Sequence, residues 1–421
     1  MRAGPLQLNV INPDDRLECF PVALADETAI EPELMTLDWR SKLIHPEAVA
    51  PAGFRSLATP TFRGSTTILS GAVDVTDHWD QSQTPYRYGL YGTPTTLELA
   101  ARIAELEGGE HCFITPGGQA AIALIYMSFA SAGSHVLVPD SVYGPSRDLA
   151  TRLLARLNID AEYYDPSVGS EIERLCRDNT QLIWCESPGS VTMEIQDIPA
   201  ITRVARSRHI VTALDNTYSA GVLFDAFSHG IDVTMQALTK YIGGHSDLLL
   251  GSVTVRGNEL YRQLGDVHQL LGMNSSPDDC SLALRGLQTL AVRLEQLENS
   301  TVAIARFLSE QREIQTLMHP AFPSCPGHEL WKRDFKGSAS VFSVLFKKSV
   351  SRESIIRFID ALKLFKLGFS WGGVTSLVMR YEELERTTPV PSGNIVRFNV
   401  GLEAVADLIA DLSAAWAIFR R

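Results

Sequence analysis

Along the chain, segments with apolar residues at helical spacing alternate with short apolar runs typical of strands. This alternation predicts the order of the helices and strands. From residue 96 to residue 107 the apolar residues recur at helical spacing, and Gly108-Gly109 ends that segment. Short apolar runs then alternate with helical segments. The predicted strands are residues 112–115, 135–138, 161–164, 182–185 and 210–214, and the predicted helices start at Gln119, Pro145 and Ser170 and cover residues 198–207. This alternation predicts an α/β fold, with a mainly parallel sheet covered by helices.

The two ends of the chain have other patterns. Residues 1–91 are irregular and rich in Pro and Thr, which predicts an N-terminal extension and arm that reaches a neighbouring subunit. Near the C-terminus we predict a helical stretch at 277–311, strands at 340–346 and 395–399, and amphipathic helices at 351–362 and 404–415. We therefore expect the extension to be followed by a large domain at 92–286 and a smaller α+β domain at 287–421.

Composition narrows the class of protein. The 421 residues are 45% hydrophobic and 20% charged, which is ordinary for a soluble globular protein. A net charge of −12 and the lack of a basic stripe argue against nucleic acid as a partner. We expect no membrane segment and no signal peptide, because no apolar run is long enough to span a bilayer. The six cysteines show no metal-ligand spacing, so we expect no metal and a cytoplasmic protein with reduced thiols.

Lys240 is the first candidate for chemistry. It follows the apolar run at 231–238 and precedes Gly243-Gly244, whereas most lysines lie on solvated faces. An amine that is desolvated at such a place has a lowered pKa and can form a Schiff base with a carbonyl. The carbonyl cofactor that uses a lysine in this way is pyridoxal 5'-phosphate (PLP).

Two further motifs fit a PLP site, although each is weak alone. Asp215 ends the predicted strand at 210–214 and could pair with a protonated pyridine nitrogen, while an isolated aspartate there is usually a turn residue. Gly117-Gly118, followed by Gln119, lies between a strand and a helix. Such a turn lets a phosphate approach the helix N-terminus.

Three more side chains have both a functional and a structural interpretation. Tyr143 lies in the loop after the strand at 135–138 and could stack on a cofactor ring or pack on the sheet edge. Arg397 lies within a strand-like run and could bind a substrate carboxylate or be an edge-strand arginine. For Glu186 we favour a structural role over that of a general acid.

The order of these motifs resembles the PLP-dependent enzymes of cysteine and methionine metabolism, which have the aspartate-aminotransferase fold (PLP fold type I). The resemblance runs from about Ser41 to the C-terminus. Its most specific segments are residues 105–109, 186–190, 214–217, 239–241, 244–247, 327–335 and 369–373. Members of this family are homotetramers with shared active sites, which would account for the irregular arm.

The resemblance implies a role for each matching residue. Lys240 would bind PLP covalently and move the Cα proton, and Asp215 would pair with the pyridinium nitrogen. Tyr143 would stack on the ring and assist the leaving group, and Tyr88 would reach the phosphate of a neighbouring subunit's cofactor. The other residues implied in cofactor binding are Gly117, Gly118, Gln119, Thr217 and Thr239, and those implied in substrate binding are Ser370, Trp371 and Arg397.

The chain also departs from the family pattern. Leu90 stands where the family usually has a phosphate-binding arginine, so a contact worth about 1.5–3 kcal/mol is lost if neither Arg87 nor Arg63 replaces it. Ala237 stands in place of a common serine, and Ser190 in place of an asparagine.

Within the family, Gly189-Ser190 and residues 370–373 favour the β-lyase branch. We therefore expect a C–S β-lyase that cleaves L-cystathionine, or a related S-substituted cysteine, to homocysteine, pyruvate and ammonia. A γ-elimination or γ-replacement enzyme stays open, because the family motifs are shared. A non-catalytic PLP-fold binding protein is the least favoured alternative, since Lys240, Asp215 and Arg397 are all present.

Overall fold

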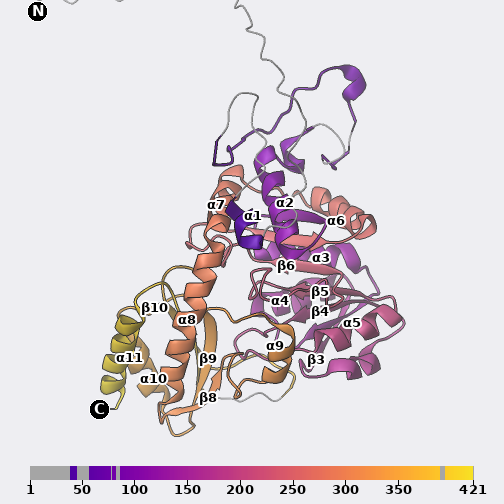
Figure 1. The fold of residues 1–421 in the computed structure, drawn as a ribbon. Coiled ribbons are helices and arrows are strands. Elements are labelled where there is room, and N and C mark those ends of the chain that lie inside the picture. The colour runs from indigo at the N-terminus through magenta and orange to yellow at the C-terminus, as the bar shows by residue number, and fades with distance from the viewer. Residues whose placement is uncertain (1–37, 45–55, 77, 82–85, 389–393, 421) are drawn as a thin grey trace, which may run out of the picture.

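The computed structural model describes residues 38–44, 56–76, 78–81, 86–388 and 394–420. Of the predicted extension and arm at residues 1–91, residues 1–37, 45–55, 77 and 82–85 lie outside the described residues. Two β-sheets organise the described residues, a seven-stranded sheet and a five-stranded sheet (Figure 1). The elements that precede the first sheet are helix α1 (Trp39–Ile44), the 3-10 turns η2 (Ala72–Asp74) and η3 (Gly89–Tyr91), and helix α2 (Pro94–Glu107).

The seven-stranded sheet has the strand order β1-β7-β6-β5-β4-β2-β3. Its strands are β1 (His111–Thr115), β2 (His135–Pro139), β3 (Asp160–Tyr164), β4 (Thr180–Glu186), β5 (Val211–Asp215), β6 (Val233–Gln236) and β7 (Gly251–Val255). Only β7 pairs antiparallel with its neighbours, which confirms the predicted mainly parallel sheet. Strands β6 and β7 were not predicted, because no helix separates β5, β6 and β7 and the alternation of strands with helices stops there.

Helices cover both faces of this sheet because successive side chains of each strand point to opposite faces. In β4, Leu182 and Trp184 belong to the core cluster that contains α3 (Gly118–Phe129), and α6 (Asn258–Leu270) contributes to the same cluster. Ile183 and Cys185 pack instead with α5 (Ile198–Ser207). The predicted α5 is confirmed, and the Asp197 side chain caps it by accepting a hydrogen bond from Ala200 N.

Three helical predictions are wrong in detail. The helix expected from Ser170 is the 3-10 helix η5 (Gly169–Leu175), and the one expected from Pro145 is a short α4 (Gly144–Asp148) followed by the π-helical turn η4 (Leu149–Leu154). The stretch expected at 277–311 is two helices, α7 (Pro277–Gln288) and α8 (Leu290–Ser309). They separate at Thr289, whose N–H and hydroxyl both donate to Gly286 O and so compete with the regular helical ladder.

The five-stranded sheet has the order β10-β11-β12-β9-β8 and is antiparallel except between β10 and β11. Its strands are β8 (Ile314–Met318), β9 (Val341–Phe346), β10 (Lys366–Leu367), β11 (Leu377–Tyr381) and β12 (Ile395–Asn399), and the helices that follow α8 are α9 (His328–Asp334), α10 (Arg352–Ala361) and α11 (Val405–Phe419). Figure 1 shows α8, α10 and α11 gathered beside this sheet, where Phe346, Phe358 and Trp416 are buried. The domain boundaries at 91/92 and 286/287 stay a prediction.

The described residues lack two features. None of their helices is long and apolar enough to cross a membrane. They contain no group of three or more His, Cys, Asp or Glu side chains arranged to hold a metal ion.

Candidate active site

A cavity of about 500 Å³ lies where the ends of strands from the two sheets meet. Ligands of a parallel α/β sheet bind beyond the carboxyl ends of its strands, and Asp215 at the end of β5 lines this cavity. The other predicted site residues in the lining are Gly117, Gly118, Gln119, Tyr143, Thr217, Thr239, Lys240, Trp371 and Arg397. Residues that are far apart in sequence are thus brought together in one cavity.

Lys240 lies in the turn after β6, with its amine directed at the second sheet's side of the cavity. Its Nζ donates to Ser370 Oγ at 2.6 Å and lies 5.2 Å from the centre of the Trp371 ring. Burial and the positive charge of Arg397 lower the pKa of Lys240 to about 8, although the negative charge of Asp215 opposes this shift. Part of the amine is therefore unprotonated near neutral pH and able to attack a carbonyl.

A buried arginine holds the turn that follows Lys240. Arg293 donates to Tyr241 O at 2.6 Å and to Gly286 O at 2.7 Å. Gly244 has a φ of +71°, and a Cβ at this position would lie 2.2 Å from Arg293 Nη1. Glycine is therefore required both by the backbone conformation and by the close approach of the guanidinium.

We expect Arg293→Met to lower the free energy of unfolding by about 3 kcal/mol, because two buried carbonyls lose a charged donor. Urea unfolding measures this change. The control is Arg208→Met, which removes an exposed ion pair with Glu173 and should change stability by less than about 1 kcal/mol. Unchanged stability of Arg293→Met would show that the arginine does not fix the turn.

Asp215 lines the cavity from the carboxyl end of β5. In the sheet it is the register partner of Glu186 in β4 and of Met235 in β6. Burial raises the pKa of Asp215, whereas hydrogen bonds from Thr217 and the charge of Lys240 lower it. Thr217 N donates to Asp215 Oδ1 at 3.0 Å. Asp215 is only partly exposed to solvent, and a carboxylate in such a place is stabilised if a cation pairs with it.

Glu186 fixes the backbone of Tyr143, whose N–H donates to Glu186 Oε2 at 2.8 Å. Burial and the neighbouring Asp215 raise the pKa of Glu186 well above its usual range, which favours the neutral acid. Burial, Asp215 and Glu186 also raise the pKa of Tyr143, so its phenol keeps its proton at neutral pH. The structural interpretation of Glu186 stays a prediction, and this contact with Tyr143 is consistent with it.

The turn after β1 forms another wall of the cavity. Gly117 gives α3 no side-chain cap, so the first N–H groups of that helix are available to a ligand. A Cβ on Gly118 would lie 2.8 Å from the Ala237 Cβ, so only glycine fits against this neighbour. The Gln119 side chain ties the turn to the Tyr143 loop by donating to Pro145 O at 2.8 Å.

Arg397 and Ser370 lie on the side of the second sheet. Arg397 is in the middle of β12, is 9% exposed, and donates from Nη2 to Ser370 O at 3.3 Å. Ser370 has a φ of +80°, which is unusual for a residue other than glycine. With this backbone, Ser370 offers its hydroxyl to Lys240 and its carbonyl to Arg397, and it lines a second cavity that adjoins the first.

Known proteins with similar sequences agree with the PLP site that this geometry suggests. Residues 40–417 match the model of a family described as Cys/Met metabolism PLP-dependent enzymes. The chain belongs to this family.

Among similar proteins, a cystathionine beta-lyase of Escherichia coli is 40% identical, over 78% of this chain and 85% of that protein. A putative cystathionine beta-lyase of Rhizobium johnstonii is 43% identical, over 79% of this chain and 85% of that protein. The crystal structure of a cystathionine gamma synthase from Xanthomonas oryzae pv. oryzae is similar with a TM-score of 0.84. It is 27% identical and covers 91% of this chain and 99% of that one.

The family cofactor is PLP, and the residues of the cavity fit it. The uncapped N-terminus of α3 suits a phosphate, and the partly buried Asp215 carboxylate suits a pyridinium nitrogen. The Tyr143 ring suits stacking on the cofactor ring, and the unprotonated fraction of the Lys240 amine suits attack on the cofactor aldehyde. PLP, when bound, supplies an electron sink that stabilises negative charge at the substrate Cα.

The arm residues lie apart from this cavity within the chain. Tyr88 is 49% exposed, and its ring packs edge-on against Tyr91. Leu90 lines a separate cavity of about 60 Å³, so the structure of one chain does not bring these residues to Lys240. Among the candidates to replace the missing arginine, Arg63 pairs with Asp278, and the Arg87 guanidinium donates to Asp74 O.

Proposed function

We propose that this chain is a C–S β-lyase that cleaves L-cystathionine, or a related S-substituted cysteine, to homocysteine, pyruvate and ammonia. The observation that carries the proposal is that Asp215, Lys240 and Arg397 line one cavity, where Lys240 donates to the Ser370 hydroxyl and Arg397 to the Ser370 carbonyl. The similarity to proteins named cystathionine beta-lyase supports the choice of substrate.

In this reaction the polar side chains of the cavity bind the substrate and transfer protons. Arg397 binds the substrate α-carboxylate through its guanidinium, and the Ser370 hydroxyl and the Trp371 ring complete that side of the cavity. The Lys240 amine, with a pKa of about 8, takes the proton from Cα. The bonding pair of the C–S bond leaves with sulfur, and the Tyr143 hydroxyl, which keeps its proton, protonates the thiolate.

The identity of the 2-oxo acid released from L-cystathionine tests this proposal. We expect pyruvate with homocysteine, because proton removal at Cα followed by loss of sulfur at Cβ is sufficient for β-elimination. 2-Oxobutyrate with cysteine would make the protein a γ-lyase, for which a base must also remove a proton at Cβ. No oxo acid from a protein with bound cofactor would place the substrate elsewhere or indicate a binding role.

We also propose a cytoplasmic homotetramer with shared active sites, in which Tyr88 acts at the cavity of a neighbouring subunit. The exposure of Tyr88, away from the cavity of its own chain, supports this arrangement. The five cysteines that the structure describes are free thiols, which supports a reducing compartment. Light scattering gives the mass of the assembly, and a monomer would contradict the proposal.

A further inference from the structure

The second cavity has a volume of about 370 Å³ and shares lining residues with the first, among them Tyr143, Lys240 and Arg397. Its outer wall comes from the segment that follows β11, which we call the strap (residues 382–388). The first cavity holds the residues that fit the cofactor, and Lys240 lines both. The second cavity is lined by Ser370, Trp371 and Arg397, which the proposed function assigns to the α-carboxylate, and by the strap. The part of a substrate beyond its sulfur atom is therefore expected to extend toward the strap.

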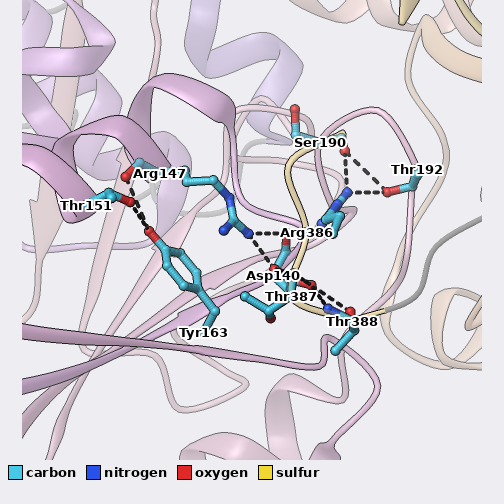
Figure 2. Close-up of polar contacts among 9 residues, drawn as sticks. All are labelled: Asp140, Arg147, Thr151, Tyr163, Ser190, Thr192, Arg386, Thr387 and Thr388. Carbon is cyan, nitrogen blue, oxygen red and sulfur yellow. Dashed lines mark hydrogen bonds and ion pairs between the residues drawn. The ribbon is translucent and has the colours of Figure 1, made fainter. Parts of the chain in front are cut away.

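The strap is fixed at one point by Asp140, which follows β2 and is 1% exposed. Thr387 N donates to both carboxylate oxygens at 2.9 Å, and Thr388 donates to Oδ2 from its N at 2.8 Å and from its hydroxyl at 2.6 Å (Figure 2). Burial alone would raise the pKa of Asp140, but hydrogen bonds from Thr388, Thr387 and Arg147 lower it to about 2. The carboxylate is therefore ionised at every working pH.

Arg386 fixes the strap at a second point. Its Nη2 donates to Thr192 Oγ1 at 2.6 Å and to Ser190 O at 3.3 Å, both in the loop after β4 (Figure 2). Asp140 belongs to the loop after β2, which carries Tyr143. The strap thus joins the two loops whose residues Tyr143 and Ser190 line both cavities.

Arg147 supports Asp140 from the side opposite the strap. It donates from Nη2 to Asp140 Oδ1 at 2.5 Å, and its guanidinium lies 3.9 Å from the centre of the Tyr163 ring. The Tyr163 hydroxyl also exchanges a hydrogen bond with Thr151 at 2.8 Å. Thr151 therefore belongs to the same network but does not contact the strap (Figure 2).

We propose that Asp140 is a positioning residue for substrate specificity. By fixing the strap it sets the shape of the second cavity, and so selects substrates by the group attached beyond sulfur. The inference rests on the proposed function in one respect, namely that the substrate is an S-substituted cysteine with its Cα near Lys240. Arg386, Thr387 and Thr388 act with Asp140 through the contacts described above.

The kinetic test compares a long and a short substrate in Asp140→Asn and Thr388→Val. We expect the KM for L-cystathionine to rise roughly tenfold in Asp140→Asn and roughly threefold in Thr388→Val, because charged hydrogen bonds to the strap are lost. The kcat/KM for S-methyl-L-cysteine should stay within about twofold of wild type, since its methyl group does not need the strap. A purely structural role would instead change the two substrates equally, and that result would overturn the proposal.

Amide hydrogen exchange supplies a measurement that does not depend on turnover. In Asp140→Asn the amides of Thr387 and Thr388 should exchange faster, because Asp140 is the acceptor that protects them. In Thr388→Val the amides at positions 387 and 388 should exchange faster to a smaller extent, because only the hydroxyl bond that also holds the strap to Asp140 is lost. Thr151→Val is the matched control, and it should leave both the exchange rates and the KM for L-cystathionine at their wild-type values. Unchanged exchange in Asp140→Asn would also overturn the proposal.

Two further points keep the test decisive. If Asp140→Asn does not fold, Thr388→Val decides, because it leaves the carboxylate and its contact with Arg147 in place. If wild type releases 2-oxobutyrate rather than pyruvate, the β-lyase proposal fails. The comparison of long and short substrates still tests whether Asp140 sets specificity through the strap. If wild type does not cleave cystathionine, two measurements test the role of the strap. They are the amide exchange rates and the affinities for S-substituted cysteines, which cofactor absorbance reports.

Discussion

Lys240→Ala is expected to abolish turnover of L-cystathionine, with a loss of at least about 10⁴-fold in kcat. In the proposed function Lys240 supplies both the amine that binds PLP covalently and the base that removes the Cα proton, so the substitution should remove both. Burial and Arg397 lower the pKa of this amine to about 8, which makes it suited to both. Pyruvate release measures the loss.

Borohydride reduction gives an independent measurement for this variant. In wild type it should fix PLP to the peptide that contains Lys240, as a mass increase, and in Lys240→Ala that peptide should be unmodified. Lys332→Ala is a suitable control, because Lys332 forms an exposed ion pair with Glu329 and should keep full activity. Turnover that survives largely intact in Lys240→Ala would refute the assignment.

The fold was predictable where sequence periods were long and regular. Helices α2, α3 and α5 could be recognised because each buries an apolar face at helical spacing, and strands β1 to β5 because each is a short run between helical segments. The antiparallel β7 could not, because pairing direction depends on the path of the chain between strands and not on the pattern within a strand. The break at Thr289 was also missed, since it depends on one hydroxyl that competes with the helical ladder.

The candidate site was predictable on the cofactor side because its residues follow strands that end at one edge of a sheet. The contacts across the cavity were not, since Lys240 and Ser370 are 130 positions apart. Asp140 was missed for a related reason. It follows a predicted strand, but three of its four bonds to the strap come from backbone N–H groups, which every sequence except proline provides.

The roles of the arm residues do not follow from the structure of a single chain. The arm carries a recognisable motif around Tyr88, but that side chain lies away from the cavity of its own subunit. In the proposed assembly, the role of Tyr88 and the group that replaces an arginine at Leu90 would depend on a second subunit. Both stay predictions that follow from the resemblance to the family.

Asp215→Asn is expected to lower kcat/KM by about 10²- to 10³-fold. The amide has nearly the shape of the carboxylate but lacks the charge that stabilises a protonated ring nitrogen, so the cofactor should still bind while charge at Cα is less stabilised. Steady-state kinetics with L-cystathionine measure this effect. Asp165→Asn, which changes an exposed turn residue after β3, should leave kcat/KM unchanged.

The same substitution should also change the cofactor-free protein. The negative charge of Asp215 favours the ammonium form of Lys240 and so raises its pKa, against burial and Arg397, which lower it. Loss of that charge should therefore move the pKa of Lys240 below its value of about 8. The pH dependence of lysine acylation in the cofactor-free protein reports this pKa. A value equal to that of wild type would mean that Asp215 and Lys240 do not interact across the cavity, and the assignment of Asp215 to the ring nitrogen would lose its electrostatic basis.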